Sequence, residues 1–267
     1  MWSIFTRIIK DRRVQILVYC LASVGLLWMY IIFFPAIKEQ SANMEQLLKS
    51  YPESFLKAFN FDIRSLNTVE GFLSTEQFSF VWPLMVIFMM IGFGGGAFAG
   101  EIEKGTIEIL LAQPVSRLKI FFGRYLAGLF VLIIFTTLSV YAAIPFCKIY
   151  NIDINTAAFN KMALLSFLFA WAIYGLAIML SAMFSDKGKV FFISGGLLVL
   201  MYVLKIVASI KDSLSDLKFA SFFYYYDPTK ALLDNEIDKW AFVVFWSVAI
   251  ICTLIGAIWF AKRDIAA

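Results

Sequence analysis

Residues 78–100 read FSFVWPLMVIFMMIGFGGGAFAG, and residues 101–117 continue as EIEKGTIEILLAQPVSR. The first stretch contains no charged side chain, and a run of about 20 apolar residues is long enough to cross a hydrocarbon core of about 30 Å as a helix. Charges begin at Glu101 and recur throughout the second stretch. The pair therefore predicts a membrane-spanning helix followed by a polar segment outside the bilayer.

The composition extends this prediction to the whole chain. Hydrophobic residues make up 61% of the 267 residues and charged residues 16%, against about 45–50% and about 25% in soluble domains. The absence of histidine excludes a Ser-His-Asp triad and an HExxH zinc site. The three cysteines lie inside apolar runs without motif spacing, so neither a disulfide framework nor a zinc knuckle is expected.

Six apolar runs are long enough to span a membrane, so we expect an all-α integral membrane protein with a single transmembrane domain. The predicted membrane helices cover residues 14–34, 78–100, 125–147, 162–184, 190–210 and 240–261. A long outer loop (35–77), a loop after the second helix (101–118) and a second outer loop (211–239) connect them. Pro35 is expected to end the first helix. The runs contain no acidic residue, which argues against a proton- or sodium-coupled carrier.

The distribution of basic residues predicts the orientation. Six crossings leave both termini on one side, and the short segments on that side are the more densely basic. They carry Arg7, Lys10, Arg12, Arg13, Lys104, Arg117, Lys119, Arg124, Lys187, Lys189, Lys262 and Arg263. Because cytoplasmic loops are enriched in Lys and Arg, both termini are expected in the cytoplasm.

Residues 1–13 are expected to form an amphipathic helix. Trp2, Phe5 and Ile9 recur at helical spacing, with Arg7 and Lys10 on the other face. Such a helix lies in the inner membrane interface, with its cations near the lipid head groups.

The outer loops contain three features of interest. Ser41 to Phe59 is helix-like and is divided by Pro52. The aromatic cluster Phe222 to Tyr226 could either cap the mouth of a pathway or pack at the interface. Lys205 is the one charge well inside a run, near its outer end, where snorkelling is favoured over a substrate-facing role.

The loop after the second helix is expected to hold a short helix of its own. Thr106 is a candidate N-cap, Pro114 ends the helix, and Ser116 can cap the next one. One side of the short helix is apolar, formed by Ile107, Leu110 and Leu111. That side is buried either by lying flat on the membrane or by docking to a partner protein.

Glycines around this loop suggest two further sites. Gly100 to Thr106 (GEIEKGT) has the glycine spacing of a phosphate-binding loop but lacks its lysine, so it is rejected as a nucleotide site. Gly92, Gly96 and Gly100 recur every four residues, and such a stripe lets a second helix approach closely. The stripe is interpreted either as ordinary internal packing or as a subunit seam.

Taken together, the six predicted membrane helices and the loop after the second of them resemble the six-helix membrane subunit of an ATP-binding-cassette (ABC) transporter of the type-2 exporter family. The resemblance is carried by the pattern E-x-E-x-G-T-x-E-x-L-L-x-x-P-x-S-R. The matching residues are Glu101, Glu103, Gly105, Thr106, Glu108, Leu110, Leu111, Pro114, Ser116 and Arg117. Supporting matches are Tyr226-Asp227-Pro228 and Arg263-Asp264, whereas Gly123-Arg124 replaces the family's Gly-Lys.

The resemblance implies that these loop residues form a coupling helix seated in a groove of a separate ABC ATPase subunit. Residues 2–12 would be the connecting helix. The chain itself would bind no cofactor, because ATP and Mg²⁺ would bind to the ATPase, and it would be no enzyme. Two permease chains, identical or different, would complete the complex in the prokaryotic inner (cytoplasmic) membrane as a multi-pass protein, with no nucleic-acid partner.

The function that the resemblance implies is substrate export driven by ATP hydrolysis in the partner. The alternatives are a non-transporting sensor or scaffold coupled to the ATPase, and a membrane-embedded enzyme, which the lack of histidine and of acids in the runs disfavours. The sequence identifies neither the substrate nor whether Lys205 or Tyr224 to Tyr226 line a pathway.

Overall fold

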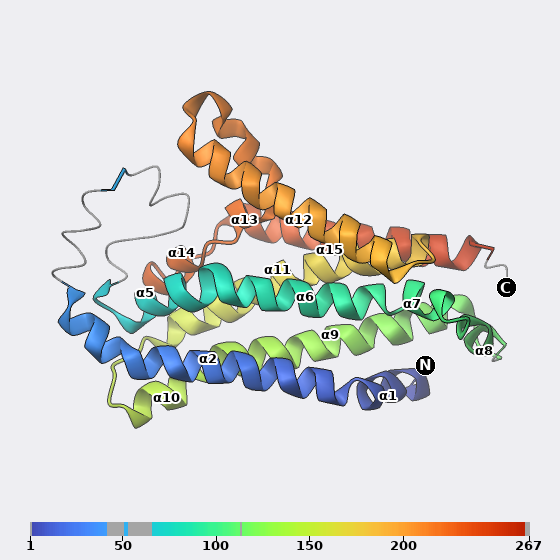
Figure 1. The fold of residues 1–267 in the computed structure, drawn as a ribbon, viewed down its shortest axis with the longest axis horizontal. Helices are drawn as coiled ribbons and strands as arrows, with labels where there is room; N and C mark the ends of the chain where they lie inside the picture. Colours follow the sequence, from blue (N-terminus) through green and yellow to red (C-terminus); the bar gives the residue numbers. More distant parts are fainter. Residues whose placement is uncertain (1, 42–50, 53–65, 113, 265–267) are drawn as a thin grey trace.

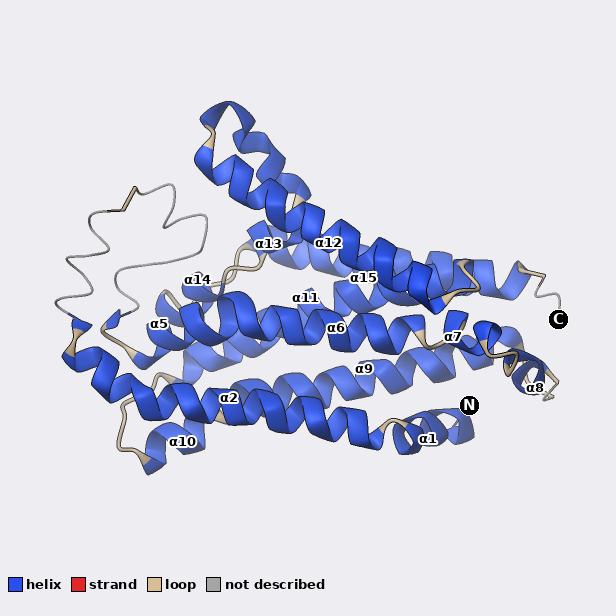
Figure 2. Cartoon of the chain, in the orientation of Figure 1, coloured by secondary structure: helices blue, strands red, loops and turns tan. Residues whose placement is uncertain are grey.

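The computed structural model describes residues 2–41, 51–52, 66–112 and 114–264. Within these ranges the chain is helical and contains no strand, which confirms the predicted fold class (Figure 2). Most of the predicted outer helix from Ser41 to Phe59 lies outside the described residues.

Six helical segments in the described part of the chain are long and apolar enough to cross a membrane. They are α2 (Arg13–Glu39); Val69–Gly95, which comprises α5 (Val69–Leu73), the π-helix η2 (Ser74–Val81) and α6 (Trp82–Gly95); Arg117–Ile149, which comprises α9 (Arg117–Tyr141) and α10 (Ala143–Ile149); α11 (Thr156–Met183); α12 (Lys187–Ile210); and α15 (Lys239–Lys262).

Several of these segments extend beyond the predicted runs. The first continues through Pro35 to Glu39, because a proline inside a helix removes one hydrogen bond and neighbouring groups compensate in a membrane protein. The third begins at Arg117, where Ser116 Oγ accepts a hydrogen bond from Lys119 N at 3.4 Å. Charged first turns can project beyond the hydrocarbon, so an apolar run underestimates the length of its helix.

The second segment differs most from its prediction. It begins at Val69, inside the predicted outer loop, and α6 ends at Gly95 instead of Gly100. The early start brings Glu70 and Glu76 into the span. The inference that the spans contain no acidic residue was therefore wrong. Its physical reason is that a helix can bury a carboxylate that has a partner: Glu70 Oε1 accepts a hydrogen bond from Asn155 N at 2.5 Å.

Helix α11 is the most buried span and forms the centre of the bundle, packed against α15, α6 and α9. Helices α2 and α12 are the least buried spans. Their outward faces carry exposed large apolar side chains, including Leu17, Leu21 and Phe192, as expected of helices surrounded by lipid. Both chain termini lie at the same end of the bundle (Figure 1).

The opposite end carries the second outer loop, which is largely helical. It contains the 3-10 helix η3 (Asp212–Ala220), α13 (Phe222–Tyr225) and α14 (Pro228–Leu233). The aromatic cluster packs inward: Phe222, Phe223 and Tyr226 are buried. The ring centroid of Tyr226 lies 4.4 Å from that of Phe169 in α11.

Lys205 lies in α12 where η3 and α13 fold back along that helix. Its side chain is only 8% exposed. The predicted snorkelling to water was therefore wrong, because η3 and α13 pack against α12 and the lysine is buried within the protein.

Candidate functional site

The candidate site lies at the end of the bundle that carries the termini. Three short helices gather there: α1 (Trp2–Asp11), α7 (Ala99–Glu103) and α8 (Ile107–Leu111). Helix α1 packs against α9, and α7 contacts both α11 and α12 (Figure 1). The loop that carries the sequence pattern is thus built onto the ends of the spanning helices.

The second span is broken between α6 and α7, and one serine from α11 holds the break. Ser181 Oγ accepts hydrogen bonds from Phe98 N and Ala99 N, each at 3.0 Å. It also donates to Gly95 O at 3.1 Å. The serine is fully buried, so it satisfies backbone groups that the interrupted helix would otherwise leave unpaired without water.

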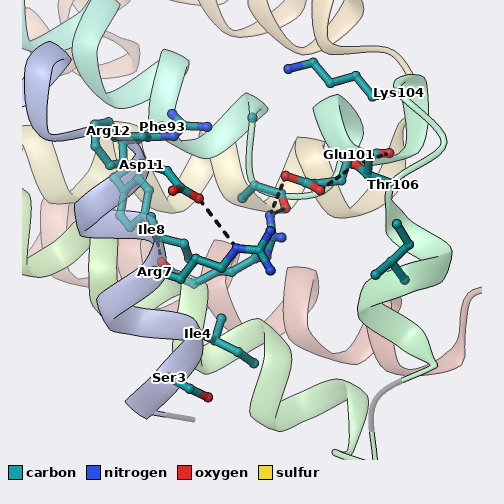
Figure 3. A pocket seen from close by; sticks show the side chains of 15 residues that line it. Ser3, Ile4, Arg7, Ile8, Asp11, Arg12, Phe93, Glu101, Lys104 and Thr106 are labelled. Carbon is teal, nitrogen blue, oxygen red and sulfur yellow. Dashed lines mark hydrogen bonds and ion pairs between the residues drawn. The ribbon is translucent and has the colours of Figure 1, made fainter.

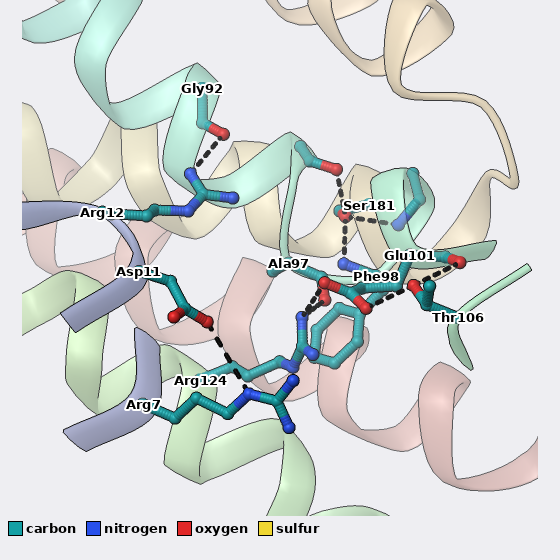
Figure 4. A network of polar contacts seen from close by, with 12 residues as sticks. Arg7, Asp11, Arg12, Gly92, Ala97, Phe98, Glu101, Thr106, Arg124 and Ser181 are labelled. Atoms are coloured by element: carbon teal, nitrogen blue, oxygen red, sulfur yellow. Dashed lines mark hydrogen bonds and ion pairs between the residues drawn. The ribbon is translucent and has the colours of Figure 1, made fainter. Parts of the chain in front are cut away.

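Arg124 of α9 binds the other side of the break (Figure 4). Its Nη1 donates to Ala97 O and lies 3.5 Å from Glu101 Oε1. Tyr174 of α11 donates from its hydroxyl to Arg124 O at 3.2 Å. A charged side chain that is 10% exposed requires such partners, so α9, α11 and the broken helix form one polar network.

Arg12 connects the junction of α1 and α2 to the same region. Its Nη1 donates to Gly92 O at 3.0 Å, and its guanidinium carbon lies 4.7 Å from the centroid of the Phe93 ring. Burial lowers the pKa of Arg12 from its ordinary value, an effect that nearby Glu101 opposes.

The glycine stripe packs inside the chain. A methyl group at Gly96 would collide with the Arg12 guanidinium, and one at Gly100 would lie 3.5 Å from Lys187 Cδ of α12. Gly92 faces Gln15 and Phe191 at ordinary contact distances. The three glycines thus serve internal packing of α6 and α7, and a role at a seam with a second subunit stays a prediction.

The turn between α7 and α8 explains one glycine of the pattern. Gly105 has a φ of 69°, a conformation that glycine adopts without strain. Thr106 N donates to Glu101 O at 2.9 Å and Gly105 N to Ile102 O at 3.0 Å, which is the hydrogen-bond pattern of a Schellman motif. Thr106 Oγ1 donates to Glu101 Oε2 at 2.6 Å, and its side chain makes no capping bond. Thr106 thus occupies the predicted N-cap position of α8, but its hydroxyl bonds to Glu101 and does not cap the helix.

Helix α8 is oriented differently from its prediction. Ile107 is 3% exposed and Leu111 is partly buried, both against the core of this chain. Ile109 is 69% exposed, and Glu108 and Ala112 beside it are exposed as well. The two described residues of the predicted apolar side, Ile107 and Leu111, therefore face inward, and the exposed apolar side chain among the described ones of this helix is that of Ile109.

The segments flanking α8 are anchored to the bundle. Glu103 Oε2 accepts a hydrogen bond from Lys187 N, at the start of α12, at 3.0 Å. Arg117 donates to Arg263 O, and Arg263 Nη1 donates to Ala182 O at 2.9 Å. These bonds join the ends of α9, α11 and α15. Pro114, in the segment between α8 and α9, is exposed.

Four of these anchoring residues were not singled out as site residues from the sequence: Arg12, Arg124, Ser181 and Arg263. Arg12 was interpreted as part of a basic flank, and Ser181 sits in an apolar run like any other small residue. A signal existed for Arg124 and Arg263, which belong to supporting parts of the family pattern.

Comparison with known families identifies the group to which this architecture belongs. Residues 2–264 match the family described as ABC-2 family transporter protein. The chain belongs to the ABC-2 family. It is a multi-pass membrane component of an ABC transporter, and the family implies partnership with an ABC ATPase subunit. No match was found among curated proteins.

Proposed function

We propose that this ABC-2 permease couples to its ATPase through the free side of α8, and that ATP hydrolysis in the partner drives substrate export. The observation that supports the proposal most directly is the exposure of Ile109 on a helix whose opposite side is anchored in the core. Ile109 lies beside exposed Glu108 and Ala112, and a partner protein that docks there would bury the isoleucine within a more polar rim.

The contacts of the loop supply a route from α8 into the membrane. Glu101 contacts Arg124 of α9, and Glu103 contacts the first residue of α12. Ser181 holds the preceding break against α11. A displacement of α8 by the ATPase would therefore move the ends of several spanning helices together. Interfaces of this kind transmit motion because their packed elements move as rigid bodies.

Membership of the family supports the rest of the proposed complex. ATP and Mg²⁺ bind to the ATPase, and two permease chains, identical or different, form the pathway. The basic flanks of the spans support a cytoplasmic location for the termini and α8, where the ATPase would bind. The chain is thus proposed to be the membrane subunit of an exporter in the prokaryotic inner membrane, without an ATPase site of its own.

The test replaces Ile109 with aspartate in the permease co-expressed with its ATPase. Burial of one isoleucine contributes about 1.5–3 kcal/mol, so Ile109→Asp is expected to weaken the permease–ATPase complex at least about tenfold. Vesicles that contain the variant are expected to lose ATP-driven transport. Both quantities are measured on complexes reconstituted from purified subunits.

Ile149→Asp is the matched control, because Ile149 is 67% exposed and lies in α10 at the opposite end of the third span. It is expected to leave both complex formation and transport unchanged. Full transport with an intact complex in Ile109→Asp would refute the docking assignment. A complex whose ATPase activity responds to no transported compound would favour the sensor alternative.

A further inference from the structure

A cavity of about 570 Å³ lies between α1, the break in the second span, and α8. Figure 3 shows its lining side chains, among them Arg7 and Arg12 from the N-terminal segment and Glu101 and Thr106 from the α7–α8 region. Cavities of this size hold small molecules or parts of larger ones. The ABC-2 coupling role uses α8 but gives this cavity no occupant.

The cavity carries more positive than negative charge. Its basic side chains are Arg7, Arg12, Lys104 and Arg124, whereas its acidic side chains are Asp11 and Glu101. Arg7 pairs with Asp11 at 3.7 Å and Arg124 with Glu101 at 3.5 Å. Both carboxylates are thus already paired, and the positive charge of Arg12 and Lys104 is left in excess.

Arg124 adds a buried positive charge to the wall of the cavity. Its side chain is 10% exposed and pairs with Glu101. Arg7 and Arg12 line the same cavity. Because cations gathered in a poorly hydrated site repel one another, an anion in the cavity would lower this repulsion.

The walls indicate what kind of anion fits. Three apolar side chains line the cavity beside the cations: Ile4, Ile8 and Phe93. The cavity is therefore complementary to a ligand that has both an anionic group and an apolar part. Helix α1 is amphipathic, with Trp2 exposed at its start, as in helices that lie in a membrane interface. Arginine side chains match phosphate oxygens in geometry and charge, and basic pockets beside membrane helices bind lipid head groups.

We propose that this cavity binds a phosphate group, and that its source is the head group of an anionic phospholipid in the leaflet on the side of the termini. The phosphate lies between Arg7, Arg12 and Arg124, and the glycerol end of the acyl chains lies against Ile4 and Ile8. Because Thr106, the N-cap of α8, also lines the cavity, the bound lipid holds α1 and the start of α8 together.

Binding to the purified full-length chain tests this proposal without the ATPase, so its outcome is independent of the proposed coupling. The probes are dihexanoyl phosphatidic acid, dihexanoylglycerol with the same tails but no phosphate, and inorganic phosphate. The readout is the binding isotherm in detergent. Dihexanoyl phosphatidic acid is expected to bind at least about tenfold more tightly than either other probe, since a charge-assisted hydrogen bond contributes about 1.5–3 kcal/mol.

Arg7→Gln removes one cavity cation whose side chain is largely exposed, so the variant is expected to fold. It should weaken binding of dihexanoyl phosphatidic acid about tenfold. Lys119→Gln is the matched control, because Lys119 is exposed on the same side but does not line the cavity, and it should leave binding unchanged.

Each other result overturns the proposal. Equal affinity for inorganic phosphate would overturn the lipid source, and equal affinity for dihexanoylglycerol would show that the tails alone bind. Equal losses in Arg7→Gln and Lys119→Gln would show attraction to general surface charge. Absence of binding by all three probes would exclude the site altogether.

Discussion

The close packing between α6 and α11 at Gly94 yields a prediction with a defined sign. A Cβ atom at Gly94 would lie 2.6 Å from Ala177 Cβ and 3.0 Å from two backbone atoms of α11. Carbon atoms in favourable contact are about 3.5–4.0 Å apart. In Gly94→Ala the two helices must therefore separate by about 1 Å, because backbone atoms cannot rotate away as a flexible side chain can.

The magnitude follows from two opposing effects. Overpacking a close contact costs about 1–3 kcal/mol. The cost at Gly94 is expected at the upper end of this range, because two of the neighbouring atoms belong to the backbone and cannot rotate away. Alanine gains about 1 kcal/mol over glycine in a helix interior. The net expectation is that Gly94→Ala lowers the free energy of unfolding by about 2 kcal/mol.

Gly25→Ala is the matched control. Gly25 also lies inside a spanning helix, but nothing lies within 4 Å of the position where a Cβ would be built. The variant keeps only the helix-propensity gain, about 1 kcal/mol. Thermal unfolding of the purified chain in detergent should shift down by about 4–8 °C for Gly94→Ala and up by about 2–4 °C for Gly25→Ala. A Gly94→Ala midpoint at or above that of the wild type would refute the close approach of α6 and α11.

Two further predictions concern the ends of the helices. Ser181→Ala removes three buried hydrogen bonds and should lower the free energy of unfolding by about 2–4 kcal/mol. Ser194 is the control, because its hydroxyl is buried without a partner among the described residues, and Ser194→Ala should lower that free energy by less than about 1 kcal/mol. Equal losses in the two variants would contradict the role of Ser181. Arg263→Gln removes the guanidinium hydrogen bonds to the carbonyl groups at the end of α11. It should speed hydrogen exchange of the amides in the last turn of α11 about tenfold. Exchange at the wild-type rate would contradict the proposed stabilisation of this helix end by Arg263.

The number of spans was predictable because lipid imposes a simple rule. A helix must satisfy its own backbone and present about 20 apolar residues to the bilayer, and this pattern is visible in any single run. The ends of the helices were less predictable. Outside the hydrocarbon a helix may carry charges, as at Arg117, or may bury a paired carboxylate, as at Glu70.

The side of α8 that remains free could not be predicted from periodicity. The pattern of Ile107 and Leu111 shows that the helix has an apolar side, but that side packs against its own chain. The exposed position, Ile109, does not belong to the pattern of the sequence. Only the path of the chain from the α6 break decides which side points outward.

The break itself also depends on contacts distant in sequence. Several glycines in succession weaken a helix wherever they occur, yet the place where this one ends depends on Ser181, and its flank depends on Arg124. Lys205 illustrates the same dependence, since it is buried in a helix against which the distant η3 and α13 pack.

The sequence by itself thus determined that lipid surrounds the chain, that the fold is all-α, and how many spans it has. It also determined the family pattern between the second and third spans and the candidate N-cap at Ser116. These follow from local chemistry: apolar length, charge placement and capping residues act within one or two helical turns. The tertiary structure decided which side of α8 is free, how Arg12, Arg124 and Ser181 converge on one break, and that four cations share a cavity with two carboxylates. Those features require residues about 80 positions apart to meet, as Ser181 and Phe98 do, and only packing of the whole bundle brings them together.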